Sequence, residues 1–131
     1  MNIGAASRAT GVNAKKIRHY EAIGLLAPPA RHENSYRDYG DLEVHELRFI
    51  GRARKLGFSI AEIGRLLALW RDKDRPSRDV QRIAATHLAD LDRRIVEMNT
   101  MAATLRKLVQ ACHGDGRPEC PILEDIAARK N

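Results

Sequence analysis

A regular repeat of apolar residues in the second half of the chain constrains the fold more than any other sequence feature. The apolar positions alternate by four and three, as in a coiled-coil seam close to four heptads long: Ala84, Leu88, Leu91, Ile95, Met98, Ala102, Leu105 and Val109. A helix over residues 77–111 would be on the order of 50 Å long, at about 1.5 Å per residue. The rest of the chain is too short to cover such a helix, so we expect it to pair with another one.

The favoured partner is a second copy of the chain, because two-fold homodimers are the commonest oligomers. A helix buried within its own monomer is the less favoured alternative, and the seam by itself leaves parallel and antiparallel pairing open. Ser77 is well placed to cap the start of this helix, after a charged linker over residues 72–76. Residues 112–120 then form a loop, and Pro121 opens a last short helix.

The N-terminal residues 3–26 have the pattern of a helix-turn-helix. Gly11 supplies a tight turn between two short helices, and Asn13 is well suited to cap the second one. A proline pair at residues 28–29 stops helical structure, and residues 31–40 predict a short polar hairpin or loop. Such an excursion forms a wing beside the two helices.

Two further helices are expected after the wing. Asp41 can cap the first, which runs toward Leu56 and ends at Gly57, and Ser59 can cap the second. The fold class is therefore mainly α with a small β wing. We expect three parts: a winged helix-turn-helix domain (1–71), a linker with the dimerisation helix (72–111), and a loop with a short C-terminal helix (112–131).

The charge of the chain favours a polyanionic partner such as nucleic acid. Its 131 residues include 23 Lys and Arg against 17 Asp and Glu, and residues 1–60 alone hold 10 basic and 6 acidic side chains. The N-terminus has no signal-peptide pattern and no stretch approaches a transmembrane helix, so we expect a cytoplasmic protein without a membrane partner. No nucleophile elbow, phosphate loop or His-Glu-x-x-His motif is present, which argues against an enzyme.

The second helix of the helix-turn-helix carries most of the candidate DNA contacts. Such a helix lies in the major groove, where Lys and Arg reach phosphates and guanine edges, and Arg18 is the first choice for a contact. An ordinary solvated basic face is the alternative. The candidate contacts are Lys15, Lys16, Arg18, His19 and Tyr20 in this helix, Arg31, Tyr36 and Arg37 in the wing, and Arg54 after it, where Arg52 and Lys55 could add phosphate contacts. Tyr39 is expected in the core.

The two cysteines, Cys112 and Cys120, are eight positions apart in the loop and can converge on one ion. Thiolates are soft donors that favour Cu(I), and two ligands are too few for structural zinc, which takes four. A two-coordinate site suits Cu(I), Ag(I) or Au(I), one ion per subunit. The alternatives are inert thiols, an adventitious disulfide or a reversible redox pair. His113 could add a third ligand and admit Zn(II), but we favour an exposed loop histidine.

A family resemblance joins these features. The segment IGAASRATGVNAKKIRHYEAIGLLAPPARHENSYRDY resembles the winged head of MerR-type regulators, and LRFIGRARKLGFSIAEIGRLL, the long helix and the Cys-x7-Cys loop followed by Pro-Ile are similar to the copper-efflux regulator (CueR) branch. The resemblance covers the whole chain. At the start of the long helix this branch has serine, as here at Ser77, whereas relatives that sense divalent metals have a cysteine.

The resemblance implies how such a protein works. It implies an antiparallel dimerisation helix, a metal loop, and binding to a double-stranded promoter with an overlong spacer, with or without metal. Metal binding would twist and bend the DNA so that RNA polymerase engages both promoter elements. The expected function is a Cu(I)-, Ag(I)- or Au(I)-dependent activator of metal efflux or detoxification genes. The alternative is a MerR-type regulator that senses a divalent metal such as Zn(II) or responds to thiol oxidation.

Overall fold

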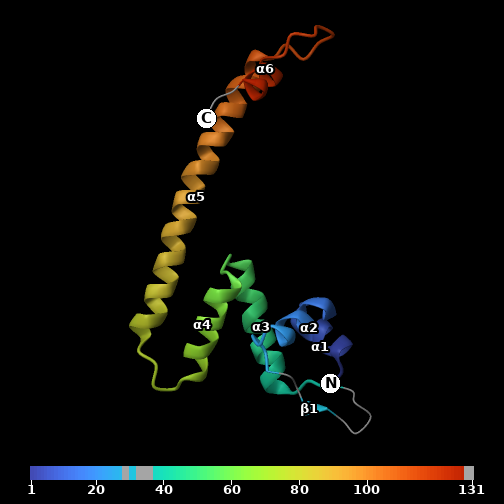
Figure 1. Cartoon of the computed structure of the whole chain (residues 1–131), viewed down its shortest axis with the longest axis vertical. Helices are drawn as coiled ribbons and strands as arrows, with labels where there is room; N and C mark the ends of the chain where they lie inside the picture. Colours follow the sequence, from blue (N-terminus) through green and yellow to red (C-terminus); the bar gives the residue numbers. More distant parts are fainter. Residues whose placement is uncertain (28–29, 32–36, 129–131) are drawn as a thin grey trace. The chain divides into compact units, whose positions relative to one another are not determined.

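The computed structural model describes residues 1–27, 30–31 and 37–128, and the chain divides into two compact units, residues 1–84 and 85–131. The elements in chain order are α1 (Ile3–Thr10), α2 (Ala14–Ala22), β1 (Ala30–Arg31), β2 (Arg37–Asp38), α3 (Asp41–Lys55), α4 (Ile60–Arg71), α5 (Ser77–Ala111) and α6 (Pro121–Ala127) (Figure 1). The expected mainly α fold with a small β wing is confirmed.

The first two helices form the expected helix-turn-helix. Gly11 follows α1 with φ at 76°, a left-handed conformation that glycine adopts without strain, and its N–H donates to the Ser7 carbonyl at 2.9 Å. The Asn13 side chain accepts the Lys16 backbone N–H at 2.8 Å and so caps α2. The turn chemistry predicted from the sequence is therefore present.

The two short strands form the base of the wing. They pair antiparallel, with Ala30 opposite Asp38, while the connecting residues 32–36 lie outside the described part of the chain. Tyr39, directly after β2, is only 1% exposed, and its hydroxyl donates to Glu21 Oε1 in α2 at 2.5 Å. The predicted core position of Tyr39 is confirmed, and this hydrogen bond ties the base of the wing to the second helix of the helix-turn-helix.

Of the next two helix N-caps, that of α4 agrees with the sequence prediction and that of α3 differs from it. Ser59 caps α4 and forms a reciprocal pair with Glu62, at 3.2 Å and 2.9 Å. By contrast, α3 begins at Asp41 itself, so the expected Asp41 cap is wrong and Gly40 is the N-cap. The Glu43 carboxylate accepts the Gly40 N–H at 3.0 Å, which leaves Asp41 in the first turn, where its charge favours the helix dipole.

The core of the first unit lies where α1, α2, α3 and α4 meet, with contacts between α1 and α2, α1 and α3, and α3 and α4. Its most completely buried side chains are Tyr39, Ile17, Leu26, Leu47, Ile50, Ile63 and Leu67. The turn approaches α3 closely at Gly51, where an added Cβ would lie 3.2 Å from Val12 Cγ2. This close approach fixes the helix-turn-helix against α3.

The long helix α5 has the bounds 77–111 expected from the sequence and is 35 residues long. It begins at Ser77 itself, so the expected Ser77 cap is wrong, and the Pro76 carbonyl accepts the Asp79 N–H at 3.1 Å. Large apolar side chains of the second unit are exposed within the single chain, including Leu88, Ile95, Met98, Leu105 and Val109 of the seam. Among the described residues, no helix combines the length and apolarity that crossing a membrane requires.

Candidate nucleic-acid interface and metal centre

Three polar side chains share the exposed face of α2. Lys15, Arg18 and His19 are exposed, and their spacing of three and four residues places them on one side of the helix. The opposite side carries Ile17 and Glu21, which are buried in the core. This face of α2 is thus available to a groove of nucleic acid.

Two other predicted contacts of α2 lie on a different face. Lys16 is exposed but lines a cavity beside α2, and Tyr20 lines the same cavity while only 5% of it is exposed. Tyr20 is chiefly a core residue, because its ring is covered by other residues of the first unit, which we call the head (residues 1–84). The sequence pattern did not separate it from the exposed positions, since a tyrosine suits either environment.

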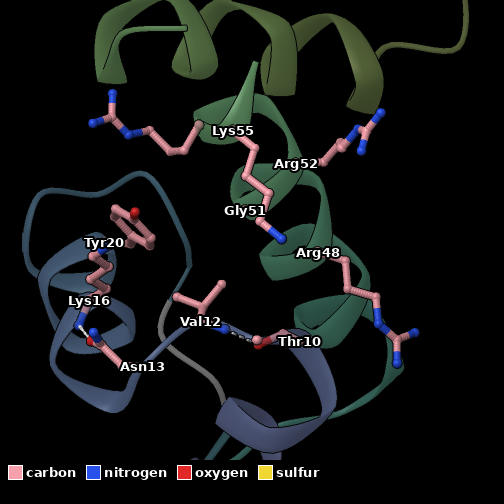
Figure 2. Close-up of a pocket in the computed structure, with 11 residues that line it drawn as sticks. Thr10, Val12, Asn13, Lys16, Tyr20, Arg48, Gly51, Arg52 and Lys55 are labelled. Atoms are coloured by element: carbon pink, nitrogen blue, oxygen red, sulfur yellow. Dashed lines mark hydrogen bonds between the residues drawn. The ribbon is translucent and has the colours of Figure 1, made fainter. Parts of the chain in front are cut away.

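The cavity lies between the turn that precedes α2 and the face of α3, and its volume is about 440 Å³. Among the described residues, its lining includes five cationic side chains, no acidic one and a few small or apolar residues: Thr10, Gly11, Val12, Asn13, Lys16, Tyr20, Arg48, Gly51, Arg52, Arg54 and Lys55. Figure 2 shows Lys55 extending along α3 toward Gly51, whereas Arg48 and Arg52 extend away from α2. A concave surface of one charge attracts the opposite charge, here a phosphate.

Two of the cavity arginines are held by backbone carbonyls. Arg48 donates from Nε and Nη2 to the Ala9 carbonyl at 3.3 Å and 3.1 Å, and Arg54 Nη1 donates to the Phe58 carbonyl at 2.8 Å. These partners are neutral, so these hydrogen bonds do not cancel either positive charge. Arg48 is not among the contacts that the sequence predicts, although its spacing of four residues to Arg52 indicates a basic stripe on α3.

The predicted wing contacts can be placed only in part. Arg31 and Arg37 face each other in the pairing of β1 and β2, and their side chains lie outside the described part of the structure. Tyr36 falls wholly outside the described residues. All three contacts stay predictions.

The two cysteines bracket the loop between α5 and α6. Cys112 follows the last residue of α5 and donates its N–H to the Leu108 carbonyl at 3.1 Å, and Cys120 stands directly before Pro121, the first residue of α6. Both are free thiols and both are half-buried. The folded loop therefore returns the chain from the end of one helix to the start of another, with a sulfur at each junction.

The surroundings of Cys120 favour its thiolate. The pKa of Cys120 is lowered, mainly by the backbone N–H of Leu123, with further hydrogen bonds from the Ile122 N–H and the Cys112 thiol, while burial and the Glu124 charge oppose the shift. Backbone donors at the start of α6 thus stabilise negative charge on Cys120, and the Cys112 thiol acts in the same direction. Two soft donors that close one loop fit a monovalent soft cation.

The charged loop residues Arg117 and Asp115 contact each other rather than the two cysteines. Arg117 pairs with Asp115 at 2.9 Å and, by these hydrogen bonds, lowers the pKa of the Asp115 carboxyl. His113 is exposed, and within the described ranges no group of three or more His, Cys, Asp or Glu side chains gathers around a possible ion. The side chains at hand are those of a two-thiol site.

Ser77, the proposed selectivity position, starts α5, while Cys112 follows its end. The 35 residues of α5 separate them by on the order of 50 Å along the helix. Ser77 can therefore lie near a thiol pair only if that pair belongs to a second copy of the chain.

Comparisons with known proteins agree over nearly the whole chain. The family described as "MerR HTH family regulatory protein" matches residues 1–70, and the one described as "MerR, DNA binding" matches residues 44–108. The chain is 56% identical to heavy metal-dependent transcription regulator 2 of Rhizobium meliloti, a match that covers 97% of this chain and 86% of that protein.

Two further relatives extend the agreement. The transcriptional regulator CueR of Escherichia coli is 40% identical, over 97% of this chain and 94% of that one. The solved structure of the transcription regulator PbrR691 from Ralstonia metallidurans in complex with Lead(II) matches with a TM-score of 0.82 and 29% identity, over 97% of this chain and 99% of that one. The relatives are regulators, which confirms that the chain is not an enzyme.

Proposed function

Because the chain belongs to the MerR family of helix-turn-helix regulatory proteins, we propose that it is a DNA-binding transcription regulator activated by Cu(I), Ag(I) or Au(I). The observation that carries the metal assignment is the placement of two free, half-buried cysteines at the two ends of one loop, Cys112 directly after α5 and Cys120 directly before α6. The genes it controls would serve metal efflux or detoxification, as the similarity to a heavy metal-dependent regulator and to CueR supports.

The DNA-binding half of the proposal depends on two adjoining surfaces of the head. Lys15, Arg18 and His19 enter the major groove from α2, where side chains of this kind read base edges. The cationic cavity beside them, with Lys16 on one wall and Arg52 on the other, receives phosphates of the flanking backbone. Two such heads in a homodimer bind the two halves of a promoter site, and the regulator acts in the cytoplasm with RNA polymerase at that promoter.

The metal half of the proposal depends on charge and donor type. Two thiolates with one monovalent ion carry a net charge of −1, which backbone N–H groups at the start of α6 stabilise. A divalent ion with only two thiolates would lack further ligands, because His113 points to solvent and no other ligand type gathers nearby in the described part of the loop. One monovalent ion per subunit follows, and its arrival changes the distortion of the bound DNA.

A metal titration tests this assignment directly. We expect the anaerobic protein to bind one Cu(I) per chain against a competing chelator, and Cys112→Ser or Cys120→Ser to abolish tight binding. His113→Ala is the matched control in the same loop and should bind as the wild type does. Tighter binding of Zn(II) than of Cu(I), together with Zn(II)-dependent transcription, would remove the monovalent assignment.

A second experiment tests the DNA surfaces. On a duplex selected in vitro from random sequences, Arg18→Ala should cost about 1–3 kcal/mol of binding and relax specificity at the contacted base. Arg52→Ala should weaken binding to all duplexes alike and reduce the salt dependence by about one phosphate contact. Arg65→Ala is the control, because Arg65 is an exposed arginine of α4 that is not among the residues lining the cavity. Unchanged affinity in Arg18→Ala would exclude this residue from the interface.

A divalent ion remains the second candidate signal, because the similar solved structure is a complex with Lead(II). In that case a third ligand must come from the loop or from a second copy of the chain. If that ligand is His113, His113→Ala would weaken Zn(II) or Pb(II) binding and leave Cu(I) binding unchanged. If it comes from a second copy of the chain, the direct comparison of Zn(II) with Cu(I) affinity in the wild type separates the two candidates. Thiol oxidation, the other alternative, would give a disulfide and no bound metal.

A further inference from the structure

A bidentate ion pair joins the last residue of α4 to α3. Arg71 donates from Nε to Glu46 Oε2 and from Nη2 to Glu46 Oε1, both at 2.8 Å. Glu46 is 4% exposed. The pair lies where α4 ends and the linker begins, not in the centre of the apolar core. These hydrogen bonds raise the pKa of Arg71 still further. A planar guanidinium opposite a carboxylate fixes direction as well as distance.

The same guanidinium also reaches the segment that leaves α2. Arg71 Nη2 donates to the Leu25 carbonyl at 3.4 Å, three residues beyond the end of α2. Leu25 itself is buried, so its carbonyl is held in place by the core. Arg71 therefore connects α3, α4 and the exit of the DNA-reading helix at a single point.

A second contact holds the neighbouring residue and the linker. The Trp70 ring stacks on His45 of α3 with centroids 5.2 Å apart, and the Arg75 guanidinium lies 5.4 Å from the Trp70 ring. Arg75 Nη1 also donates to the Asp72 carbonyl at 2.9 Å. The linker is thus folded back onto the end of α4 rather than extended.

The first turns of α5 belong to the same compact unit as the head. That unit extends to Ala84, and Ile83 of α5 packs against the head core. Since α5 is one continuous helix as far as Ala111, its start is fixed in the head while its end adjoins Cys112. A movement of the first turns of α5 therefore reaches α2 through the contacts of this junction.

We infer that Glu46 and Arg71 are positioning residues that couple the start of α5 to the DNA-reading helix α2, so that a metal signal that moves the start of α5 changes DNA geometry. The inference depends on the proposed metal response. DNA binding requires only that each head be folded. DNA distortion requires in addition that each head moves rigidly with α5. We call the Glu46–Arg71 ion pair the clasp. Weakening it should therefore reduce metal-dependent activation while leaving DNA affinity unchanged.

The test uses the full-length protein with three variants. Arg71→Lys keeps the charge but loses the fork of donors, Glu46→Gln keeps the shape but loses the charge, and the double variant combines them. We expect apo DNA affinity and Cu(I) affinity within about threefold of wild type, and metal-dependent transcription reduced at least about tenfold. The double variant should lose no more than either single variant, because the two residues act as one unit. Arg65→Lys on α4 is the matched control.

The outcomes distinguish this inference from the proposed function. A wild-type protein that shows no metal response overturns the proposed function, before any variant is compared. A responsive wild type with equally responsive clasp variants overturns the coupling role. Loss of DNA affinity in proportion to activation, with a matching loss in thermal stability, also overturns it, because the clasp would then serve only to fold the head. Bending of an end-labelled duplex, followed by energy transfer with and without Cu(I), supplies the readout that a purely structural role would not move.

Discussion

The two compact units of this chain contain the same kinds of apolar side chain in opposite surroundings. In the head, residues 1–84, Leu47 and Ile50 are completely buried, whereas in residues 85–131 Ile95 is 55% and Leu105 is 51% exposed. The head therefore gains its stability within one chain, and the seam of α5 gains its stability only from a second helix. The comparison teaches that folding and assembly are separable here, so variants of each unit should affect different measurements.

The largest effect is expected from a charge in the seam. Ile95→Asp places two like charges in the paired helices of a dimer, so its dissociation constant should rise about a thousandfold or more, or ~4 kcal/mol. Sedimentation equilibrium measures this change, and fluorescence of Trp70, the single tryptophan, should show an intact head. The control is Val96→Asp, since Val96 is 64% exposed and lies off the seam. An undissociated Ile95→Asp dimer would mean that this face is not the interface.

A truncated core side chain in the head should lower folding stability and leave the α5 seam unchanged. Leu47→Ala removes a fully buried side chain of α3 and should lower the free energy of unfolding by about 2–5 kcal/mol. Leu42→Ala in the same helix is the control, because Leu42 is 66% exposed and should change stability by less than about 0.5 kcal/mol. Urea unfolding followed by Trp70 fluorescence tests both. Equal costs at the two positions would contradict the placement of Leu47 in the packed core of the head.

A smaller loss is expected where the wing joins α2. Tyr39→Phe removes the hydroxyl that donates to Glu21 Oε1 and should cost about 1–3 kcal/mol, because a buried carboxylate loses this donor. Adding Glu21→Gln should recover part of the loss by removing the charge. Thermal unfolding measures the stability, and DNA affinity should fall in parallel if the wing is displaced. Full stability of Tyr39→Phe would show that the hydrogen bond contributes nothing to the head.

The smallest effect concerns the exposed loop of the second unit. The hydrogen bonds from Arg117 hold the pKa of the Asp115 carboxyl below its ordinary value, so Arg117→Ala should raise the Asp115 titration midpoint toward that value. Any stabilisation from this pair is present above the ordinary pKa of the carboxyl and is lost as the pH falls through the lowered one. Carboxyl NMR chemical shifts measure the midpoint, with Asp125→Asn as a control. An unmoved midpoint would mean that the pair does not persist in solution.

The sequence located the elements with local signals. Gly11 and Asn13 marked the turn and cap of the helix-turn-helix, and the heptad pattern marked the long helix α5. Such features depend on residues a few positions apart, so a linear pattern contains them. The prediction that Asp41 caps α3 was wrong, because an acidic residue suits the N-cap and the first turn equally well. Which residue becomes the N-cap depends on the backbone angles of Gly40.

By itself, then, the sequence determined the helical plan, the two-thiol loop and the basic head. Only the tertiary structure decided which basic residues of α3 share a cavity with Lys16, that Tyr20 turns inward, and that Arg71 joins Glu46 to the Leu25 carbonyl. The physical reason is distance along the chain. Glu46 and Arg71 are 25 residues apart and Leu25 and Arg71 are 46 apart, so no local pattern brings them together until the core has packed.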